Sequence, residues 1–368
     1  MNDSDYMRRA IELAKKATGF TSPNPLVGAV IVKDGRIIGE GYHKKYGELH
    51  AERDALQSCI ESAEGATIYV TLEPCCHHGK QPPCTEAIID AGIKRVVVGS
   101  RDPNPLVHGK GNEMLRSHGI IVETDFMREE CDKMNYVFFH YITTKTPYVV
   151  MKYAMTMDGK IAAFTGDSKW VTGEEARRRV HEDRHRYSAI MAGVGTVLAD
   201  DPSLTCRLEG KLNPIRIICD SKLRTPLSST IVETANKVRT IIATVCSDVD
   251  KHMEYINKGC EVVAVSEKDG HINLKALMKK LGEMKIDSVL LEGGGTLNWS
   301  AISQGIVNRV QAYIAPKIIG GEAAPSPVRG AGYELMNQAV KLSHSSIEKL
   351  GEDYLIESEV MNYVYGNN

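Results

Sequence analysis

Hydrophobic residues along the chain form short continuous runs, bounded by turn residues, that alternate with segments of helical spacing. The runs LVGAVIV (26–32) and RIIGEGY (36–42) flank the tripeptide Lys33-Asp34-Gly35. Because Asp-Gly suits the positive φ angles of a tight primed turn, the segment is predicted to be a β-hairpin. From His50 to Ser62 the apolar residues recur at helical spacing, which predicts a helix.

The same alternation continues after this helix. Strands are expected at 66–72 (ATIYVTL) and 94–99 (KRVVVG), and between them a helix at 84–91 (CTEAIIDA) that Gly92 stops. Strand, helix and strand repeated in this way predict an α/β fold with a largely parallel sheet covered by helices.

A domain boundary is predicted at the polar segment Tyr141–Pro147, which ends in proline and follows a long helical segment at 127–141. It divides the chain into domains of residues 1–145 and 146–368, in accord with an expectation of roughly one domain per 150 residues.

A capping box from Thr172 to Glu175 predicts the start of a helix over 173–187. The second domain repeats the alternation, with apolar runs at 214–220, 239–245, 260–265 and 288–295.

Composition narrows the class of protein. The 368 residues carry a formal net charge of −2, which argues against a nucleic-acid partner but allows a small anionic substrate. Apolar runs fall short of the roughly 18 residues that a membrane span needs, and the polar N-terminus does not resemble a signal peptide. Nine irregularly spaced cysteines suit free or metal-bound thiols in a reducing cytoplasm better than a disulfide scaffold.

Candidate chemistry concentrates in TLEPCCHHGKQPPCTE (71–86) and in LHAER (49–53). Zinc prefers Cys and His ligands, and a catalytic zinc site keeps one position for water. Nucleobase deaminases pair H-x-E with a P-C motif, and their Glu moves protons without binding the metal. Because residues two apart in mid-helix point about 200° apart, His50 and Glu52 can converge only at a helix start. Cys84 follows a double proline that would open a helix. The partial positive charge at the N-terminus of that helix favours the thiolate form of a cysteine placed there.

Four motifs of the first domain resemble the deaminase half of the bifunctional riboflavin-biosynthesis deaminase–reductase family: SPNPLVGAVIV, GYHKKYGELHAE, TLEPCCHHGKQPPCTEAI and RDPNPLVHGKG. The resemblance implies a cytidine-deaminase-like fold that binds one Zn²⁺ per chain through His50, Cys75 and Cys84. It implies that Glu52 is the catalytic proton shuttle. The substrate-binding residues that it implies are Asn24, His43, Lys80 and Asn104.

The zinc loop departs from the family pattern at two positions, since the family has Ser at Cys76 and Thr at Gln81. The Cys76 thiol could compete as a ligand, be oxidised, or fill a buried site as a small residue, and the last reading is favoured. His77 and His78 are expected to shape the loop or to contact substrate rather than to bind the metal.

The second domain has glycine-rich turns after apolar runs, at Ala192–Thr196 and at Glu292–Ser300, and the second precedes a helix. Backbone N–H groups at such turns can bind phosphate. Neither turn is a complete G-x-G-x-x-G fingerprint, so spacing alone leaves nucleotide binding and ordinary tight turns as equal alternatives.

The segments KYAMTMDGKIA, GDSKWVT, GVGTVLADDPSLTCR and LLEGGGTLNWS resemble the reductase half of the same family. This half implies a dihydrofolate-reductase-like fold that uses NADPH. Lys152 and Glu292 are the implied catalytic residues. The implied NADPH contacts are Ala154, Trp170, Thr196, Asp200, Ser221, Gly294, Gly295, Thr296, Leu297, Asn298, Trp299 and Ser300. The implied substrate contacts are Ser168, Arg184, Leu204, Arg207 and Glu292.

Arginine side chains of the second domain divide into two groups. Arg184 and Arg207 are expected to bind the substrate 5′-phosphate, because guanidinium matches phosphate oxygens bidentately. The run Arg177–Arg179 is expected to be a solvated helix face.

The resemblance spans about residues 5 to 360, and it predicts a cytoplasmic bifunctional enzyme and a homo-oligomer. Its steps would be hydrolytic deamination of a small phosphorylated diaminopyrimidine and NADPH-dependent reduction of its ribosyl chain. One alternative is a deaminase of free nucleosides or tRNA bases, which would leave the second domain unexplained. Another is a binding module with a structural zinc, in which Cys76 or His78 is the fourth ligand.

Overall fold

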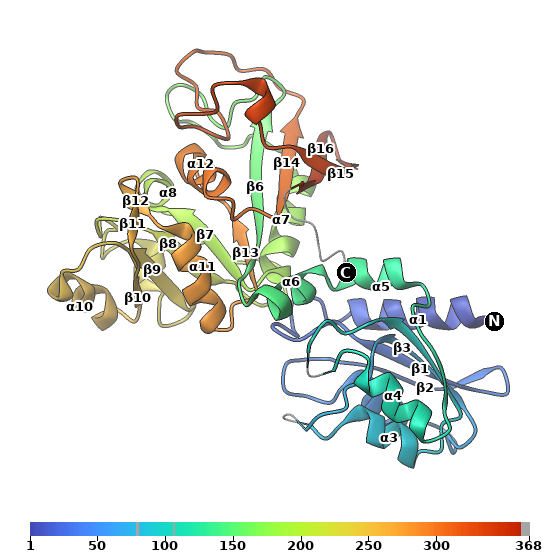
Figure 1. The fold of residues 1–368 in the computed structure, drawn as a ribbon. Helices are drawn as coiled ribbons and strands as arrows, with labels where there is room; N and C mark the ends of the chain where they lie inside the picture. The colour runs from blue at the N-terminus through green and yellow to red at the C-terminus, as the bar shows by residue number, and fades with distance from the viewer. Residues whose placement is uncertain (79–80, 106, 362–368) are drawn as a thin grey trace. The chain divides into compact units, whose positions relative to one another are not determined.

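The computed structural model describes residues 1–78, 81–105 and 107–361. The chain divides into two compact units, Met1–Lys145 (the N-terminal unit) and Thr146–Asn368 (the C-terminal unit). Each unit has its own sheet and its own helices (Figure 1). No helix in the described ranges is long and apolar enough to cross a membrane.

The N-terminal unit is built on a five-stranded sheet of order β2-β1-β3-β4-β5. Its elements are α1 (Asp3–Lys15), β1 (Gly28–Lys33), β2 (Arg36–Tyr42), α2 (Ala51–Gln57), β3 (Thr67–Leu72), α3 (Cys84–Asp90), β4 (Arg95–Ser100), α4 (Lys110–Ser117), β5 (Ile121–Glu123), α5 (Arg128–Met134) and α6 (Tyr136–Thr144). Strands β3, β4 and β5 are parallel, whereas β1 runs antiparallel to both β2 and β3. The sheet is therefore mixed rather than largely parallel, because a hairpin supplies two of its strands.

The predicted hairpin is confirmed. Lys33 pairs with Arg36 across the turn. Both residues between them have positive φ, 50° at Asp34 and 73° at Gly35, as a primed turn requires.

Helices cover both faces of this sheet, as expected. Val30 and Val32 pack with Met7 and Ala10 of α1 on one face. The intervening residue Ile31 belongs to the core on the other face, with side chains from α2, α3 and α4. Figure 1 shows α1 and α5 on one side of the strands and α3 and α4 on the other.

Two predicted helices differ from the observed ones. The helix expected over 50–62 ends at Gln57, and the Ile60 N–H donates to the Ile38 carbonyl of β2 at 2.9 Å instead of continuing the helix. The Ile60 side chain is 79% exposed. The segment expected as one helix over 127–141 is divided into α5 and α6 at Asn135. The side-chain amide of Asn135 accepts from the Leu26 N–H at 2.8 Å and donates to the Leu26 carbonyl at 2.9 Å. Tertiary hydrogen bonds therefore fix the break.

The C-terminal unit contains a nine-stranded sheet of order β10-β9-β8-β7-β13-β6-β14-β16-β15. Its elements are β6 (Tyr148–Thr156), α7 (Glu174–Arg186), β7 (Ala189–Gly193), α8 (Val194–Asp200), β8 (Ile215–Cys219), α9 (Thr230–Glu233), β9 (Thr240–Thr244), α10 (Val249–Asn257), β10 (Glu261–Ala264), β11 (Glu267–Lys268), β12 (His271–Ile272), α11 (Leu274–Glu283), β13 (Ser288–Leu291), α12 (Gly295–Ser303), β14 (Arg309–Ala315), the 3-10 turn Met336–Gln338, β15 (Leu342–Leu350) and β16 (Asp353–Val360). The strands are parallel from β10 to β14, and β16 and β15 add an antiparallel edge. The four apolar runs predicted as strands are β8, β9, β10 and β13.

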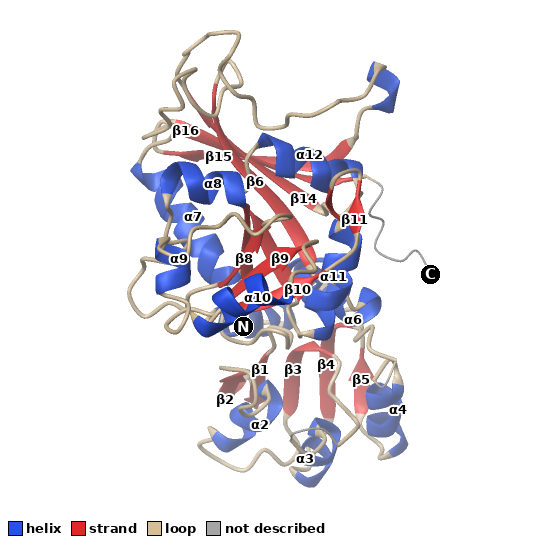
Figure 2. Ribbon diagram, turned by 90° about the vertical axis from the view of Figure 1, so that its left-hand side faces the viewer, coloured by secondary structure: helices blue, strands red, loops and turns tan. Residues whose placement is uncertain are grey.

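Helices lie on both faces of this sheet (Figure 2). On one face α11 and α12 pack against alternate residues of the central strands, including Met191 and Leu291. On the other face α8, α9 and α10 cover the intervening residues, including Ile190 and Ile218. This arrangement leaves the loops at the carboxyl ends of the parallel strands to form a ligand site.

Helix α7 begins differently from its prediction. Its N-cap is Gly173, and no side chain of the sequence Thr172 to Glu175 caps it, so the predicted capping box is wrong. The Asp353 carboxylate, from β16, accepts the Gly173 N–H at 2.6 Å instead. A distant acidic residue thus supplies the cap.

Candidate active sites

Three predicted metal ligands meet in the N-terminal unit. His50 is the N-cap of α2, Cys75 follows β3, and Cys84 opens α3 directly after Pro83. His50 Nδ1 lies 3.5 Å from Cys75 Sγ and 3.4 Å from Cys84 Sγ. One ligand atom from each residue lies within 4.8 Å of the others.

The charge of this cluster suits a metal cation. Hydrogen bonding from the Cys84 thiol, with His50 adding to it, lowers the pKa of Cys75 to about 4, against the effect of burial. The Cys84 backbone N–H also donates to Cys75 Sγ, at 3.4 Å. One imidazole and two sulfur atoms form a donor set that zinc prefers, and three protein ligands are the number that a catalytic zinc site uses.

The neighbouring residues Cys76, His77 and His78 do not join this group within the part of the chain that the structure describes. Cys76 is half-buried, and burial raises the pKa of its thiol. A closed four-ligand site, as a structural zinc would require, is therefore not formed by the described residues.

Glu52 lies beside the cluster without being one of the grouped ligands. It is the second residue of α2 and is 3% exposed. Burial, together with the negative charge of Cys75, raises the pKa of Glu52, and its carboxyl contacts the Cys84 thiol. The helix start brings His50 and Glu52 to the same place, as the sequence predicted.

Two predicted substrate residues lie next to the ligands. His43 is buried, and its Nδ1 lies 2.9 Å from the Leu49 carbonyl, which makes Nδ1–H the donor. Its Nε2 then accepts from the Asn24 amide at 3.1 Å. The His43 ring meets the His50 ring edge-on, with centroids 5.5 Å apart, and burial lowers the pKa of His43. The predicted substrate residue Lys80 lies outside the described residues.

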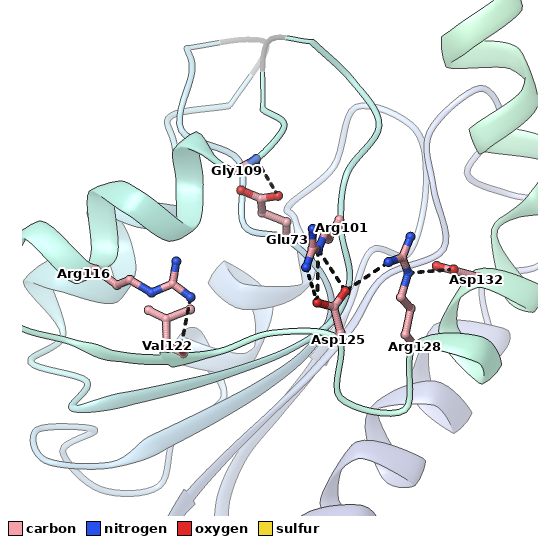
Figure 3. A network of polar contacts seen from close by, with 8 residues as sticks. All are labelled: Glu73, Arg101, Gly109, Arg116, Val122, Asp125, Arg128 and Asp132. Carbon is pink, nitrogen blue, oxygen red and sulfur yellow. Dashed lines mark hydrogen bonds and ion pairs between the residues drawn. The ribbon is translucent and has the colours of Figure 1, made fainter. Parts of the chain in front are cut away.

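Asn104 lies in the loop that follows β4. Its N–H donates to the Asp102 carboxylate at 2.8 Å, and burial raises the pKa of Asp102 to about 7. Glu73, just before the zinc loop, accepts the Gly109 N–H at 3.0 Å (Figure 3). It also accepts the Asn112 N–H at 3.2 Å. Glu73 therefore ties the zinc loop to the start of α4, where the loop carrying Asn104 ends.

The other end of this loop is held by an ion-pair chain that Figure 3 also shows. Arg101 donates to both oxygens of Asp125, at 2.9 Å and 2.5 Å. Arg128 joins Asp125 to Asp132 of α5. Both ends of the loop are thus fixed by carboxylates that sequence reasoning did not single out.

The C-terminal unit has a cavity of about 650 Å³ whose lining includes the last residues of β7 and β8 and the glycine turn that follows β13. Eight of the predicted NADPH contacts line it: Thr196, Asp200, Ser221, Gly294, Gly295, Thr296, Leu297 and Ser300. Both glycine-rich turns open a helix here, since Gly193 is the N-cap of α8 and Gly294 that of α12. The sequence predicted a helix only after the second turn.

Four predicted NADPH contacts, Ala154, Trp170, Asn298 and Trp299, do not line this cavity. The buried Asn298 amide donates to the Pro327 carbonyl at 2.8 Å. Trp299 lines a second cavity of about 310 Å³ and meets Tyr333 edge-on.

The arginine run of α7 is a solvated face only in part. The Arg177 guanidinium lies 4.8 Å from the centre of the Trp170 ring and donates to the Thr172 carbonyl. Arg179 is partly buried and lies 3.8 Å from the Asp183 carboxylate. Only Arg178 is exposed as expected, so the prediction is wrong for two of the three residues.

A buried ionic group joins three predicted residues of the reductase site. Arg184 of α7 donates to both oxygens of Glu292, at 2.7 Å and 2.9 Å, and Lys152 Nζ of β6 lies 3.7 Å from the same carboxylate. Burial opposes the charge of Glu292, but Arg184 and Lys152 outweigh it and lower its pKa to about 2. Burial lowers the pKa of Lys152, and the positive charge of Arg184 adds to this effect, against the attraction of Glu292.

The other predicted substrate residues lie in loops near α7. Leu204 is buried with a φ of 49°, Arg207 is exposed, and Ser168 is half-buried. The Arg207 guanidinium reaches the Ser203 hydroxyl at 3.5 Å. The Arg184 guanidinium is hydrogen-bonded to Glu292 in the structure. Its expected contact with the substrate phosphate therefore stays a prediction.

Sequence reasoning missed several residues that line the larger cavity. They include Lys222 and Arg224, which follow Ser221, and also His271 and Arg329. A signal for Lys222 and Arg224 was present in the sequence, because both cations closely follow the end of the apolar run 214–220.

Three metal ligands that leave room for water, with a buried carboxyl beside them, are the arrangement of hydrolytic nucleobase deaminases. The second unit supplies a cavity at the carboxyl edge of a parallel sheet, where such folds bind nucleotides. The chain is therefore of the class in which a zinc-dependent deaminase domain precedes a nucleotide-binding α/β domain.

Comparison with known proteins identifies the family. Residues 1–100 match the cytidine and deoxycytidylate deaminase zinc-binding region, and residues 147–356 match the RibD C-terminal domain. A riboflavin biosynthesis protein RibD from Actinobacillus pleuropneumoniae is 56% identical over 98% of this chain and 96% of its own length. The chain belongs to the RibD family of bifunctional deaminase–reductases of riboflavin biosynthesis, which use zinc and NADPH.

Solved structures agree with this assignment across both units. A deaminase/reductase from Thermotoga maritima is 41% identical with a TM-score of 0.87, and the match covers 97% of this chain and 98% of that one. RibD from Acinetobacter baumannii is 37% identical with a TM-score of 0.88 and the same coverage. The cytidine-deaminase-like and dihydrofolate-reductase-like folds predicted from the sequence are thereby confirmed.

Proposed function

We propose that residues 1–145 deaminate 2,5-diamino-6-ribosylamino-4(3H)-pyrimidinone 5′-phosphate and that residues 146–368 reduce the ribosyl chain of the product with NADPH, giving 5-amino-6-ribitylaminouracil 5′-phosphate. The observation that carries the proposal is the cluster of His50, Cys75 and Cys84 with Glu52 buried beside it. The relative from Thermotoga maritima is described as a diaminohydroxyphosphoribosylaminopyrimidine deaminase and 5-amino-6-(5-phosphoribosylamino)uracil reductase, which supports the choice of substrates.

In the deaminase step, His50, Cys75 and Cys84 would hold the zinc ion. When bound at such a site, zinc supplies a water molecule activated for attack at neutral pH. Glu52 would take one proton from this water and give it to the ring nitrogen, and would then carry the proton of the newly added hydroxyl group to the amino group, which leaves as ammonia. Asn24 and His43, whose mutual hydrogen bond fixes both side chains, orient the pyrimidine ring, while Lys80 and Asn104 bind the rest of the substrate.

In the reductase step, bound NADPH would supply the hydride for C1 of the ring-opened ribosylamine, which is an imine. The start of α12 at Gly295 would offer backbone N–H groups to the cofactor phosphates. Lys152 delivers the proton that the imine nitrogen gains, and Glu292 orients this ammonium and the ribose hydroxyls. Arg184 keeps Glu292 charged through its two hydrogen bonds.

The substrate is a small pyrimidine nucleotide. That no nucleic acid binds, that the chain forms a homo-oligomer and that it acts in the cytoplasm are parts of the same proposal.

A single-turnover experiment with Glu52→Gln tests this function. Wild-type protein should release ammonia without NADPH and then oxidise NADPH stoichiometrically once it is added. The Glu52→Gln variant should retain one zinc per chain and reduce the deaminated compound normally, while ammonia release falls by at least about 10²-fold.

The matched control is Glu64→Gln, an exposed carboxylate that should leave both activities unchanged. Undiminished ammonia release from Glu52→Gln would overturn the mechanism. Ammonia release from cytidine or tRNA but not from the diaminopyrimidine would favour a nucleoside or tRNA deaminase. Zinc without either activity would favour a structural metal site.

A further inference from the structure

One arginine beside the zinc ligands has no role in the chemistry described above. Arg53 lies on α2, directly after Glu52, and is half-buried. Its Nε donates to the Pro82 carbonyl at 3.2 Å, and its Nη2 donates to the Pro83 carbonyl at 2.7 Å. These two hydrogen bonds, here called the Arg53 clamp, join α2 to the segment that leads into Cys84.

The double proline leaves few other ways to hold this segment. Proline has no backbone N–H, so Pro82 and Pro83 can form backbone hydrogen bonds only through their carbonyls. Pro83 is the N-cap of α3, and its side chain forms no capping hydrogen bond. Contacts to the two carbonyls are thus the backbone hydrogen bonds open to the chain just before Cys84. A guanidinium suits both carbonyls at once, because its N–H groups form a rigid planar fork.

The clamp connects the two elements that carry the zinc ligands. Cys75 is already tied to the start of α3, since the Cys84 N–H donates to Cys75 Sγ at 3.4 Å. His50 is the N-cap of α2, so its distance from the two sulfur atoms depends on how α2 is held against α3. Arg53 supplies two hydrogen bonds between these parts of the chain, and it follows Glu52, whose carboxyl contacts the Cys84 thiol.

We propose that Arg53 is a positioning residue of the metal site, which sets the zinc affinity by holding the Cys84 thiol at the binding distance from His50. The inference rests on the proposed function, in which His50, Cys75 and Cys84 bind zinc. Groups that orient metal ligands from outside typically contribute about 10- to 100-fold to metal affinity. The charge of Arg53 acts in the opposite direction, because a guanidinium repels a nearby metal cation. Loss of the clamp and loss of the charge therefore predict opposite changes in zinc affinity.

Arg53→Met tests the inference, because it keeps the length of the side chain and removes both its N–H groups and its charge. Competition with a chromogenic chelator, in the absence of substrate, should show zinc binding weakened by about 10- to 100-fold. Arg53→Lys keeps the charge but cannot span both carbonyls, so its zinc affinity should also fall below that of the wild type. In the Co²⁺-substituted protein, both variants should change the thiolate-to-cobalt absorption, which reports the geometry of the ligands.

Arg116→Met is the matched control. Arg116 also donates from its guanidinium to a backbone carbonyl of the N-terminal unit, that of Val122 at 3.1 Å, but this carbonyl belongs to β5 rather than to the zinc loop (Figure 3). Zinc affinity and cobalt absorption of Arg116→Met should equal those of the wild type. Far-UV circular dichroism of all variants at saturating zinc should also match the wild type, so that a weaker affinity does not reflect a lost fold.

The outcomes separate this inference from the function on which it rests. Tighter or unchanged zinc binding in Arg53→Met would overturn the clamp, and so would wild-type affinity in Arg53→Lys, which serves if Arg53→Met does not fold. If wild-type protein binds zinc but releases no ammonia from the diaminopyrimidine, the proposed function fails, while the zinc affinities of the variants still decide the role of Arg53.

Discussion

Glu292 is a buried carboxylate whose charge depends on two neighbours. It is 12% exposed, and the cations of Arg184 and Lys152 lie within 4 Å of its oxygens. Removing its charge would leave both cations buried without a full partner, which costs more than the pair itself contributes. The residue therefore contributes to the stability of the C-terminal unit as well as to the proposed reduction.

This dependence predicts a specific response to pH. The pKa of Glu292 is about 2 in the folded protein against an ordinary value of 4.5. A carboxyl group whose pKa is lowered by folding stabilises the folded state fully at a pH above its ordinary, unfolded pKa. This stabilisation is lost as the pH falls towards the lower pKa of the folded protein. The unfolding free energies of wild type and Glu292→Gln should differ by about 3 kcal/mol at pH 7 and converge between pH 5 and pH 2.

Urea unfolding followed by tryptophan fluorescence measures this difference, because both tryptophans, Trp170 and Trp299, lie in the C-terminal unit. Ammonia release should be unchanged in Glu292→Gln, while reduction should be lost. A difference in unfolding free energy that stays constant from pH 7 to pH 3 would contradict the electrostatic argument.

At single residues, sequence reasoning succeeded where one local rule fixed the geometry. His50 and Glu52 had to meet at a helix start, and Cys84 had to follow its double proline, and the structure has both. It failed for Arg177 and Arg179, because their partners Trp170 and Asp183 are set by tertiary packing. No pattern within an arginine run reveals such partners.

Helix α2 is placed against the sheet by a glycine of β2. A Cβ on Gly41 would lie 2.2 Å from the Ala55 nitrogen and 2.6 Å from the Ala51 carbonyl oxygen. Both atoms are backbone, so neither can move without displacing α2. Because His50 caps α2 and Glu52 lies in its first turn, the position of the metal site depends on this close approach.

Gly41→Ala should therefore damage the deaminase site selectively. We expect a loss of about 1–3 kcal/mol in the stability of the N-terminal unit, as for other overpacked sites, with weaker zinc binding and slower ammonia release. Competition with a chromogenic chelator measures the zinc affinity. NADPH-dependent reduction of the deaminated compound by the same chain is the internal control. Wild-type zinc affinity and turnover would show that α2 accommodates the methyl group.

Among the elements, those set by local sequence were predictable. The turn at Asp34-Gly35 and the end of α3 before Gly92 follow from backbone preferences of the residues themselves. The break at Asn135 depends on Leu26, 109 residues away, and the cap of α7 depends on Asp353. In the first case a long-range hydrogen bond interrupts a segment whose periodicity favours one continuous helix. In the second case a distant carboxylate replaces the local capping box.

The two units of the whole molecule have separate cores and separate sites. All predicted deaminase residues lie within Met1–Lys145, and all predicted reductase residues lie within Thr146–Asn368. A deaminase followed by a reductase also suits two successive steps on one intermediate. Sequence motifs identified both halves and their order, whereas residues such as Arg329 that only line the cavity were not recognisable from them.

Zinc removal should separate the two activities. After dialysis against a chelator, ammonia release should fall by more than about 10²-fold, because His50, Cys75 and Cys84 would hold no Lewis acid. The zinc-free protein should then oxidise no NADPH with the diaminopyrimidine substrate, since the reductase lacks its product. Adding the deaminated compound should restore NADPH oxidation at the rate of the untreated protein, and adding zinc should restore ammonia release. Loss of NADPH oxidation with the deaminated compound would instead mean that the C-terminal unit depends on the metal, and that the two sites are not independent.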